Sequence, residues 1–198
     1  GRVKIGFPGG CSFSEKRPFD IHLEGLEALG AEVTLADEYI EVAYKEEKNA
    51  NFKMLFPSVG ATMNLVMYAV IGSSEVLLEN VALEPEVVTL IDYLNKCGGH
   101  VDFDAENRTI TIQGVAKLVG CEFEIIYDRI QAMTYAAMAY LYKTNVTITN
   151  INSTDTSNIA KPLEKLTNAG AKWEYNATNS EIKFYGKESS LKGVDIIA

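Results

Sequence analysis

One pattern occurs three times along the 198 residues and restricts the fold more than any other feature. Each time, a stretch with the apolar spacing of a helix ends at a glycine, and two short runs of strand-forming residues follow. The glycines are Gly30, Gly98 and Gly170, so the spacing is 68 residues (98 − 30) and then 72 residues (170 − 98). Glycine suits the end of a helix because it adopts left-handed backbone angles without strain. Such a repeat indicates one supersecondary unit used several times.

The second copy shows what precedes its glycine. The apolar spacing predicts strands at 51–56 and 75–81, and helices at 58–71 and 84–96. With the two strands that follow Gly98, the complete unit is βαβαββ.

The third copy repeats this order. The sequence predicts strands at 121–127 and 146–151 and a helix at 128–142. A second helix ends at Asn168, with Pro162 in its opening turns, where a missing N–H does least harm.

The first copy is incomplete, because it begins at its second strand, 3–7, which a helix from about 18 to 29 follows. Residues 194–197 resemble the opening strand of a further copy. We therefore expect an α/β (alpha+beta) fold of repeated βαβαββ units, and a chain that is a piece of a longer protein.

Composition excludes several classes of protein. Hydrophobic residues make up 47% of the chain, enough for a core and too many for a disordered protein. No apolar run approaches the ~20 residues of a membrane span, and we see no signal peptide. The net charge of −9 and the pI near 4.8 argue against nucleic acid as a partner. Three cysteines and two histidines, each far apart in the sequence, predict neither a disulfide framework nor a metal site and fit a reducing cytosol.

The segment 8–18 could carry chemistry, because Cys11 directly follows two glycines in a strand-to-helix connection. Lys16 and Arg17 lie nearby and would favour a thiolate, so Cys11 could act as an acid, a base or a nucleophile. The alternative is a glycine turn that happens to carry a small residue. Arg17, just before Pro18 at a helix start, is either an anion ligand or a solvated charge.

Two other strand-to-helix junctions could bind anions. At 57–62, a hydroxyl, free N–H groups and a glycine meet at a helix start, although the Walker A pattern is absent. At 127–131, Asp128 is a predicted cap and Arg129 could reach an anion across a cleft. Taken by itself, each junction is better explained as an ordinary helix cap. His22, one turn into its helix, suits packing as well as a site.

Together these segments resemble a known family, the UDP-N-acetylglucosamine 1-carboxyvinyltransferases. Pro8-Gly9-Gly10-Cys11 and the residues up to Ala31 resemble its signature PGGCxIGxRPxDLHxxGLxxLGA. Three further stretches resemble its segments FPSVGATxNL, ENAAxEPE and GVxxLxG…PDRIE, namely 56–65, 79–86 and 114–130. The resemblance covers nearly the whole chain.

The resemblance implies two lobes, each of three βαβαββ units, with mixed sheets and helices packed inside. By analogy, residues 1–117 belong to the lobe with the substrate loop, and residues 118–198 hold one unit of the second lobe plus a trailing strand. It also implies a cytoplasmic enzyme that transfers the enolpyruvyl group of phosphoenolpyruvate to the 3-hydroxyl of UDP-N-acetylglucosamine, in peptidoglycan synthesis, without a metal or cofactor. We expect these two small molecules as its partners, and neither nucleic acid nor membrane.

The resemblance also implies roles for single residues. Cys11 matches the loop cysteine that donates a proton to the enolpyruvyl group and is alkylated by fosfomycin. The remaining matches are substrate-binding positions: Arg17 at the phosphates, Pro18, Phe19, Asp20 and Ile21 at the uridine, Ser58, Val59 and Gly60 at the diphosphate, and His22 and Arg129 with less defined roles.

The chain departs from the signature between Cys11 and Arg17, where it has one residue more. Because the family's N-terminal segment and later arginines have no match, we expect little turnover from this chain alone. The alternatives are a nucleotide-sugar or phosphate-binding relative without catalysis, a sister enzyme that makes 5-enolpyruvylshikimate 3-phosphate, and an RNA-end-processing relative. The loop cysteine and Arg17-Pro18 argue against the second, and the net charge argues against the third.

Overall fold

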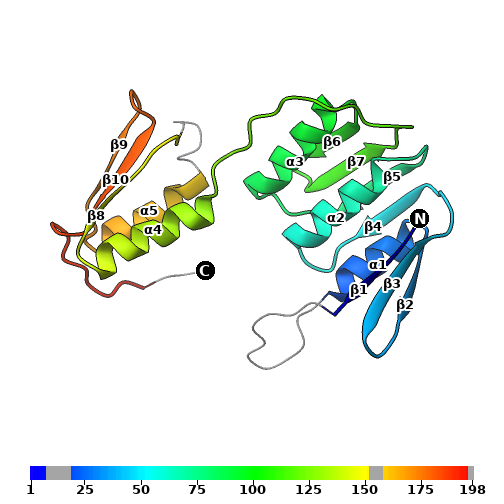
Figure 1. Ribbon diagram of the computed structural model, residues 1–198, viewed down its shortest axis with the longest axis horizontal. Coiled ribbons are helices and arrows are strands. Elements are labelled where there is room, and N and C mark those ends of the chain that lie inside the picture. Colours follow the sequence, from blue (N-terminus) through cyan, green and yellow to red (C-terminus); the bar gives the residue numbers. More distant parts are fainter. Residues whose placement is uncertain (8–18, 152–157, 196–198) are drawn as a thin grey trace. The chain divides into compact units, whose positions relative to one another are not determined.

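The computed structural model describes residues 1–7, 19–151 and 158–195 (Figure 1). The chain divides into two compact units, Gly1–Glu124 (unit 1) and Ile125–Ala198 (unit 2). The predicted boundary between 117 and 118 lies a few residues earlier, and the assignment of the two parts to different lobes stays a prediction.

Unit 1 contains one partial and one complete copy of the repeat. Its partial copy has β1 (Arg2–Gly6), α1 (Asp20–Ala28), β2 (Ala31–Leu35) and β3 (Tyr39–Tyr44). The complete copy has β4 (Ala50–Lys53), α2 (Val59–Ala69), β5 (Glu75–Glu79), α3 (Pro85–Lys96), β6 (His100–Asp104) and β7 (Thr109–Gln113). Two sheets result, with strand orders β1-β3-β2 and β4-β5-β7-β6.

Unit 2 contains the third copy. It has α4 (Arg129–Leu141), β8 (Asn145–Ile148), α5 (Ala160–Asn168), β9 (Trp173–Asn176) and β10 (Glu181–Tyr185). Its sheet has the order β8-β10-β9.

The three sheets repeat one topology. In each copy the last strand lies between the other two and pairs antiparallel with both, as β3, β7 and β10 do. The complete copy adds β4, which pairs parallel with β5 and makes that sheet mixed. The predicted alpha+beta repeat is thus confirmed. Gly30, Gly98 and Gly170 have φ of 99°, 92° and 94°, the left-handed angles that a C-terminal cap requires.

Two expected strands differ. Residues 121–127 form no strand, so that prediction is wrong. The chain here packs against α3 instead: the Val119 amide donates to the Cys97 carbonyl over 2.8 Å, and the Phe123 ring lies 5.4 Å from that of Tyr93. Of residues 194–197, Val194 and Asp195 lie in no strand, and the other two are outside the described residues.

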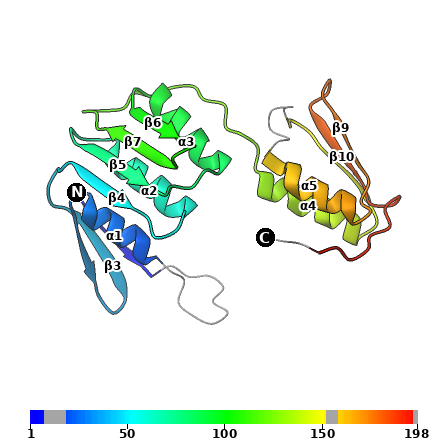
Figure 2. The same ribbon diagram turned by 180° about the vertical axis from the view of Figure 1, so that it is seen from behind.

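The core of unit 1 gathers around α2, which lies between α1 and α3 (Figure 2). Ala61, Leu65 and Val66 on α2 are fully buried against apolar residues of the β4–β7 sheet. Helix α1 approaches α2 closely at Gly25, where a β-carbon would lie 2.5 Å from Cδ1 of Leu65. Unit 2 has its own core, in which the rings of Tyr140 and Phe184 meet edge to face at 6.1 Å.

Candidate functional site

The predicted anion site at the start of α2 has the expected helix cap. Ser58 has an extended backbone, and its Oγ accepts a hydrogen bond of 3.2 Å from the Ala61 amide. The amides of Val59 and Gly60 belong to the first turn, where helix geometry offers no partner within the helix. The first turn carries no acidic side chain, so nothing on the helix itself opposes an anion there.

A buried hydroxyl holds this first turn in place. Thr62 is fully buried, and its Oγ1 donates to the carbonyl oxygen of Ser58 over 2.7 Å. Oγ1 of Thr62 in turn accepts a hydrogen bond of 3.2 Å from the amide of Ala82, which follows β5. Thr62 therefore links the N-terminus of α2 to the segment between β5 and α3.

The ring of His22 lies against this helix terminus. A β-carbon added to Gly60 would sit 3.2 Å from Cε1 and 3.5 Å from Nε2 of His22. The side chain of Asn64, one turn further along α2, meets Nδ1 of the same ring at 2.9 Å. Segment 19–22 of α1 and segment 58–60 of α2 are thus brought together through His22.

The surroundings of His22 define its chemistry. Burial lowers the pKa of its imidazole below the ordinary value of 6.5, so the ring is neutral at pH 7. With the amide nitrogen of Asn64 as donor, Nδ1 is the acceptor and the proton resides on Nε2. Nε2 is the ring nitrogen beside Gly60, so this tautomer adds an N–H donor to those of the helix terminus.

The other predicted residues of α1 have different surroundings. Phe19 is the N-cap residue of α1, and its carbonyl oxygen accepts from the His22 amide over 3.0 Å. Asp20 is exposed in the first turn. Ile21 is 5% exposed and part of the core, so a ligand would meet its backbone.

The predicted residues Cys11, Arg17 and Pro18 lie outside the described residues. Their flanking residues are described: the rings of Phe7 and Phe19 have centroids 5.9 Å apart. The described residues on either side of the segment 8–18 therefore lie close together, beside the N-terminus of α1.

Arg129 is the first residue of α4 in unit 2. Asp128 caps this helix, and its Oδ1 accepts from the Gln131 amide over 2.9 Å. Arg129 thus occupies the same place in its repeat as Val59 does in the preceding one. Because Arg129 and Ser58 belong to different units, their action on one ligand stays a prediction.

Sequence reasoning did not assign Asn64 or Thr62 to the site. Asn64 lies four residues after Gly60, and that spacing places both on one helix face, so a signal was available. Thr62 carried no signal, because its role depends on the position of Ala82.

Other features of the described residues lie away from this site. A hollow of about 720 Å³ in unit 2 lies between α4 and α5, and none of the predicted site residues lines it. In the described part of the chain, no group of three or more His, Cys, Asp or Glu could hold a metal ion. None of the described helices is long and apolar enough to cross a membrane.

Two relatives match most of the chain. It is 40% identical over 172 residues to UDP-N-acetylglucosamine 1-carboxyvinyltransferase 1 of Caldanaerobacter subterraneus subsp. tengcongensis, covering 87% of this chain and 40% of that protein. It is 39% identical over 197 residues to UDP-N-acetylglucosamine 1-carboxyvinyltransferase of Finegoldia magna, covering 99% and 45%. The chain therefore spans less than half the length of these relatives.

Solved structures share the fold. The enolpyruvyl transferase NikO from Streptomyces tendae superposes with a TM-score of 0.76 at 17% identity, covering 93% of this chain and 43% of that one. EPSP synthase from Acinetobacter baumannii gives a TM-score of 0.63 at 19% identity, covering 92% and 42%.

The family model of EPSP synthase (3-phosphoshikimate 1-carboxyvinyltransferase) matches residues 1–198. With the repeat topology and the relatives above, this match shows that the chain belongs to the EPSP synthase family of enolpyruvyl transferases.

Proposed function

We propose that the protein transfers the enolpyruvyl group of phosphoenolpyruvate to the 3-hydroxyl of UDP-N-acetylglucosamine and releases phosphate, a step of peptidoglycan synthesis in the cytoplasm. The observation that carries the proposal is the contact of the His22 ring with Gly60. This contact brings together the segments 19–22 and 58–60, which are both expected to hold the sugar nucleotide. The names of the relatives at 36–40% identity support the same substrate.

The start of α2 suits a diphosphate. Its N–H groups and the positive end of the helix dipole favour an anion, and the missing side chain of Gly60 lets phosphate oxygens approach the backbone. The hydroxyl of Ser58 and Nε2–H of His22 are further polar groups beside them. A neutral His22 donates a hydrogen bond here without the desolvation cost of a buried cation.

The proposed chemistry needs an acid and a set of anion ligands. Cys11 is the proposed proton donor to the methylene carbon of the enolpyruvyl group, and Arg17 the proposed ligand of the phosphates. The segment 18–21 is proposed to hold the uridine. Proton transfer by a thiol and charge stabilisation by a guanidinium and amides account for these roles without a metal or cofactor.

Calorimetric titration with UDP-N-acetylglucosamine tests the binding half of the proposal. We expect Gly60→Ala to weaken binding about tenfold or more, which corresponds to about 1.4 kcal/mol. Gly120→Ala is the matched control, because a β-carbon there meets nothing within 4 Å, and it should bind like the wild type. Equal affinity of the wild type and Gly60→Ala would contradict the placement of the diphosphate.

Fosfomycin tests the role of the thiol. Mass spectrometry after treatment should show one adduct on the peptide that contains Cys11 and none after Cys11→Ser. We expect this chain alone to release little phosphate with both substrates, so robust phosphate release would contradict the expectation that part of the site is missing. A relative that only binds the sugar nucleotide would bind it and form no adduct on Cys11. A chain that neither binds the nucleotide nor forms the adduct contradicts the proposal.

A further inference from the structure

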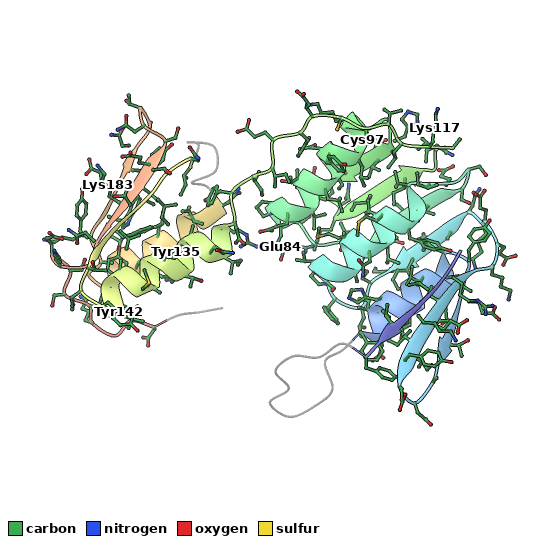
Figure 3. The ribbon with its side chains drawn as sticks, in the orientation of Figure 1. Glu84, Cys97, Lys117, Tyr135, Tyr142 and Lys183 are labelled. Carbon is green, nitrogen blue, oxygen red and sulfur yellow. The ribbon has the colours of Figure 1, made fainter. Side chains whose placement is uncertain are left out.

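Two cysteines that are far apart in the sequence meet in unit 1. Sγ of Cys97 and Sγ of Cys121 are 3.0 Å apart, and both are free thiols. Cys97 caps the C-terminus of α3 and is 3% exposed, whereas Cys121 is half-buried in the chain that leads toward unit 2. Figure 3 shows Cys97 at the end of α3 beside this chain.

Residues before and after Cys121 in the sequence hold it beside Cys97. Two residues before it, the Val119 amide donates to the carbonyl oxygen of Cys97 over 2.8 Å. Two residues after it, the Phe123 ring packs on Tyr93 at 5.4 Å and lies 5.8 Å from Nζ of Lys96. Residues 119–123, which we call the connector, are therefore docked on the last turn of α3. The approach of the two thiols follows from this docking.

We propose that Cys97 and Cys121 form a reversible disulfide, a redox modification that fastens the connector to α3. The sulfurs need to approach by only about 1 Å, since a disulfide bond measures ~2.05 Å. The modification is independent of the proposed enzymatic activity, because neither cysteine belongs to the candidate site.

The chemistry is thiol–disulfide exchange with a small-molecule disulfide as the oxidant. Cys121, the more exposed thiol, loses its proton and attacks one sulfur of the small disulfide, which releases one small thiol and leaves a mixed disulfide. Cys97 then attacks Sγ of Cys121 and releases the second small thiol. Two protein thiols are oxidised and one small disulfide is reduced to two thiols, so electrons and protons balance.

The surroundings favour the dithiol as the resting state. The hydrogen bond with Cys97 is the main cause that raises the pKa of Cys121, burial adds to it, and the Lys96 ammonium acts weakly in the opposite direction. The hydroxyl of Tyr93 also faces Cys97. A protonated thiol is a poor nucleophile, so oxidation is slow at neutral pH and requires an oxidising buffer.

The disulfide would change the freedom of the chain between the units. Unit 2 starts at Ile125, so only residues 122–124 separate the cross-link from it. Reduction leaves the connector attached to α3 by the Val119 hydrogen bond and by the contacts of the Phe123 ring with Tyr93 and Lys96.

Peptide mapping of the full chain after incubation with oxidised glutathione tests the proposal. Trypsin places the two thiols on separate peptides, 97–108 and 118–129, because it cleaves after Lys96, Arg108, Lys117 and Arg129. We expect these peptides to be joined, with the loss of two hydrogen atoms from the intact mass and reversal by dithiothreitol. Cys11→Ser should behave identically, whereas Cys97→Ser should stop at a glutathione adduct on Cys121.

The outcomes are distinct. Glutathione adducts without cross-linked peptides in the wild type, or a cross-link through Cys11 or between two chains, would overturn the proposal. Native trypsin digestion gives a second readout, because oxidation should slow cleavage at Lys117 in the wild type and not in Cys97→Ser. An unchanged cleavage rate would show that the disulfide does not fasten the connector.

Discussion

At the residue scale, His22 couples the candidate site to protonation. Its ring lies between Gly60 and Asn64, and burial lowers its pKa below 6.5. The unfolded chain therefore binds a proton at a higher pH than the folded chain does. The stability that His22 contributes is fully present above pH 6.5 and declines as the pH falls from there toward the lowered pKa.

We expect two measurements to report this coupling. An NMR titration should give a pKa of His22 below 6.5. The urea-derived free energy of unfolding should fall below pH 6.5 in the wild type, and His22→Gln should reduce that fall. A His22 pKa at or above 6.5 would show that the ring is not buried against α2 as described.

At the element scale, the glycines that end α1, α3 and α5 have similar backbone angles and differ in their surroundings. A β-carbon on Gly98 would have Val119 Cγ2 as its nearest contact at 4.0 Å, whereas on Gly170 it would lie 2.5 Å from the carbonyl oxygen of Ser190. We expect Gly98→Ala to lower the free energy of unfolding by about 1–2 kcal/mol, the cost of a left-handed residue with a side chain. Gly170→Ala should lower it by more, because backbone must also move. Urea titrations of both variants measure the two losses of unfolding free energy. Equal losses would contradict the expected clash of the Gly170→Ala side chain with the carbonyl oxygen of Ser190.

The contact of α1 with α2 offers a second prediction at this scale. Gly25→Ala should destabilise unit 1 by about 1–3 kcal/mol, because its β-carbon would overlap the Leu65 side chain. A double-mutant cycle with Leu65→Ala measures the coupling, and the double variant should lose less than the sum of the single variants. Gly6→Ala, with nothing within 4 Å, is the control. An additive cycle would mean that the two helices do not pack at this point.

Elements with local signals were predictable from the sequence. Ser58 and Asp128 act as the caps that their positions indicated, and each accepts a hydrogen bond from an amide three residues on. The strand expected at 121–127 was wrong because an apolar pattern does not reveal whether a neighbouring strand exists. The ring of Phe123 packs on Tyr93 of α3 instead.

Contacts that depend on tertiary packing were beyond local reasoning. The start of α2 was predictable from Ser58 and Gly60, but the His22 ring reaches it only because α1 packs on α2 at Gly25. The meeting of Cys97 and Cys121 likewise depends on a connector folded back on α3, and their spacing in the sequence gave no sign of it.

At the scale of the whole molecule, the two units have separate cores. One cluster of buried apolar residues lies in unit 1 and another in unit 2, and the two clusters have no member in common. Each core therefore stabilises its own unit.

Hydrogen exchange resolved by unit tests this separation. Leu78→Ala removes a fully buried side chain of unit 1 and should cost about 2–5 kcal/mol there, and Phe184→Ala should cost about 3–5 kcal/mol in unit 2. Faster exchange should appear only in the unit that carries the substitution. Equal acceleration of both units by either variant would contradict separate cores.

The contact between Phe7 and Phe19 has a consequence for how this family can diversify. The two rings set where the chain leaves β1 and where it re-enters at α1, whatever number of residues lies between them. The number of residues between the rings can therefore change while strand and helix keep their positions. A change of length at this point need not repack the interior of the molecule.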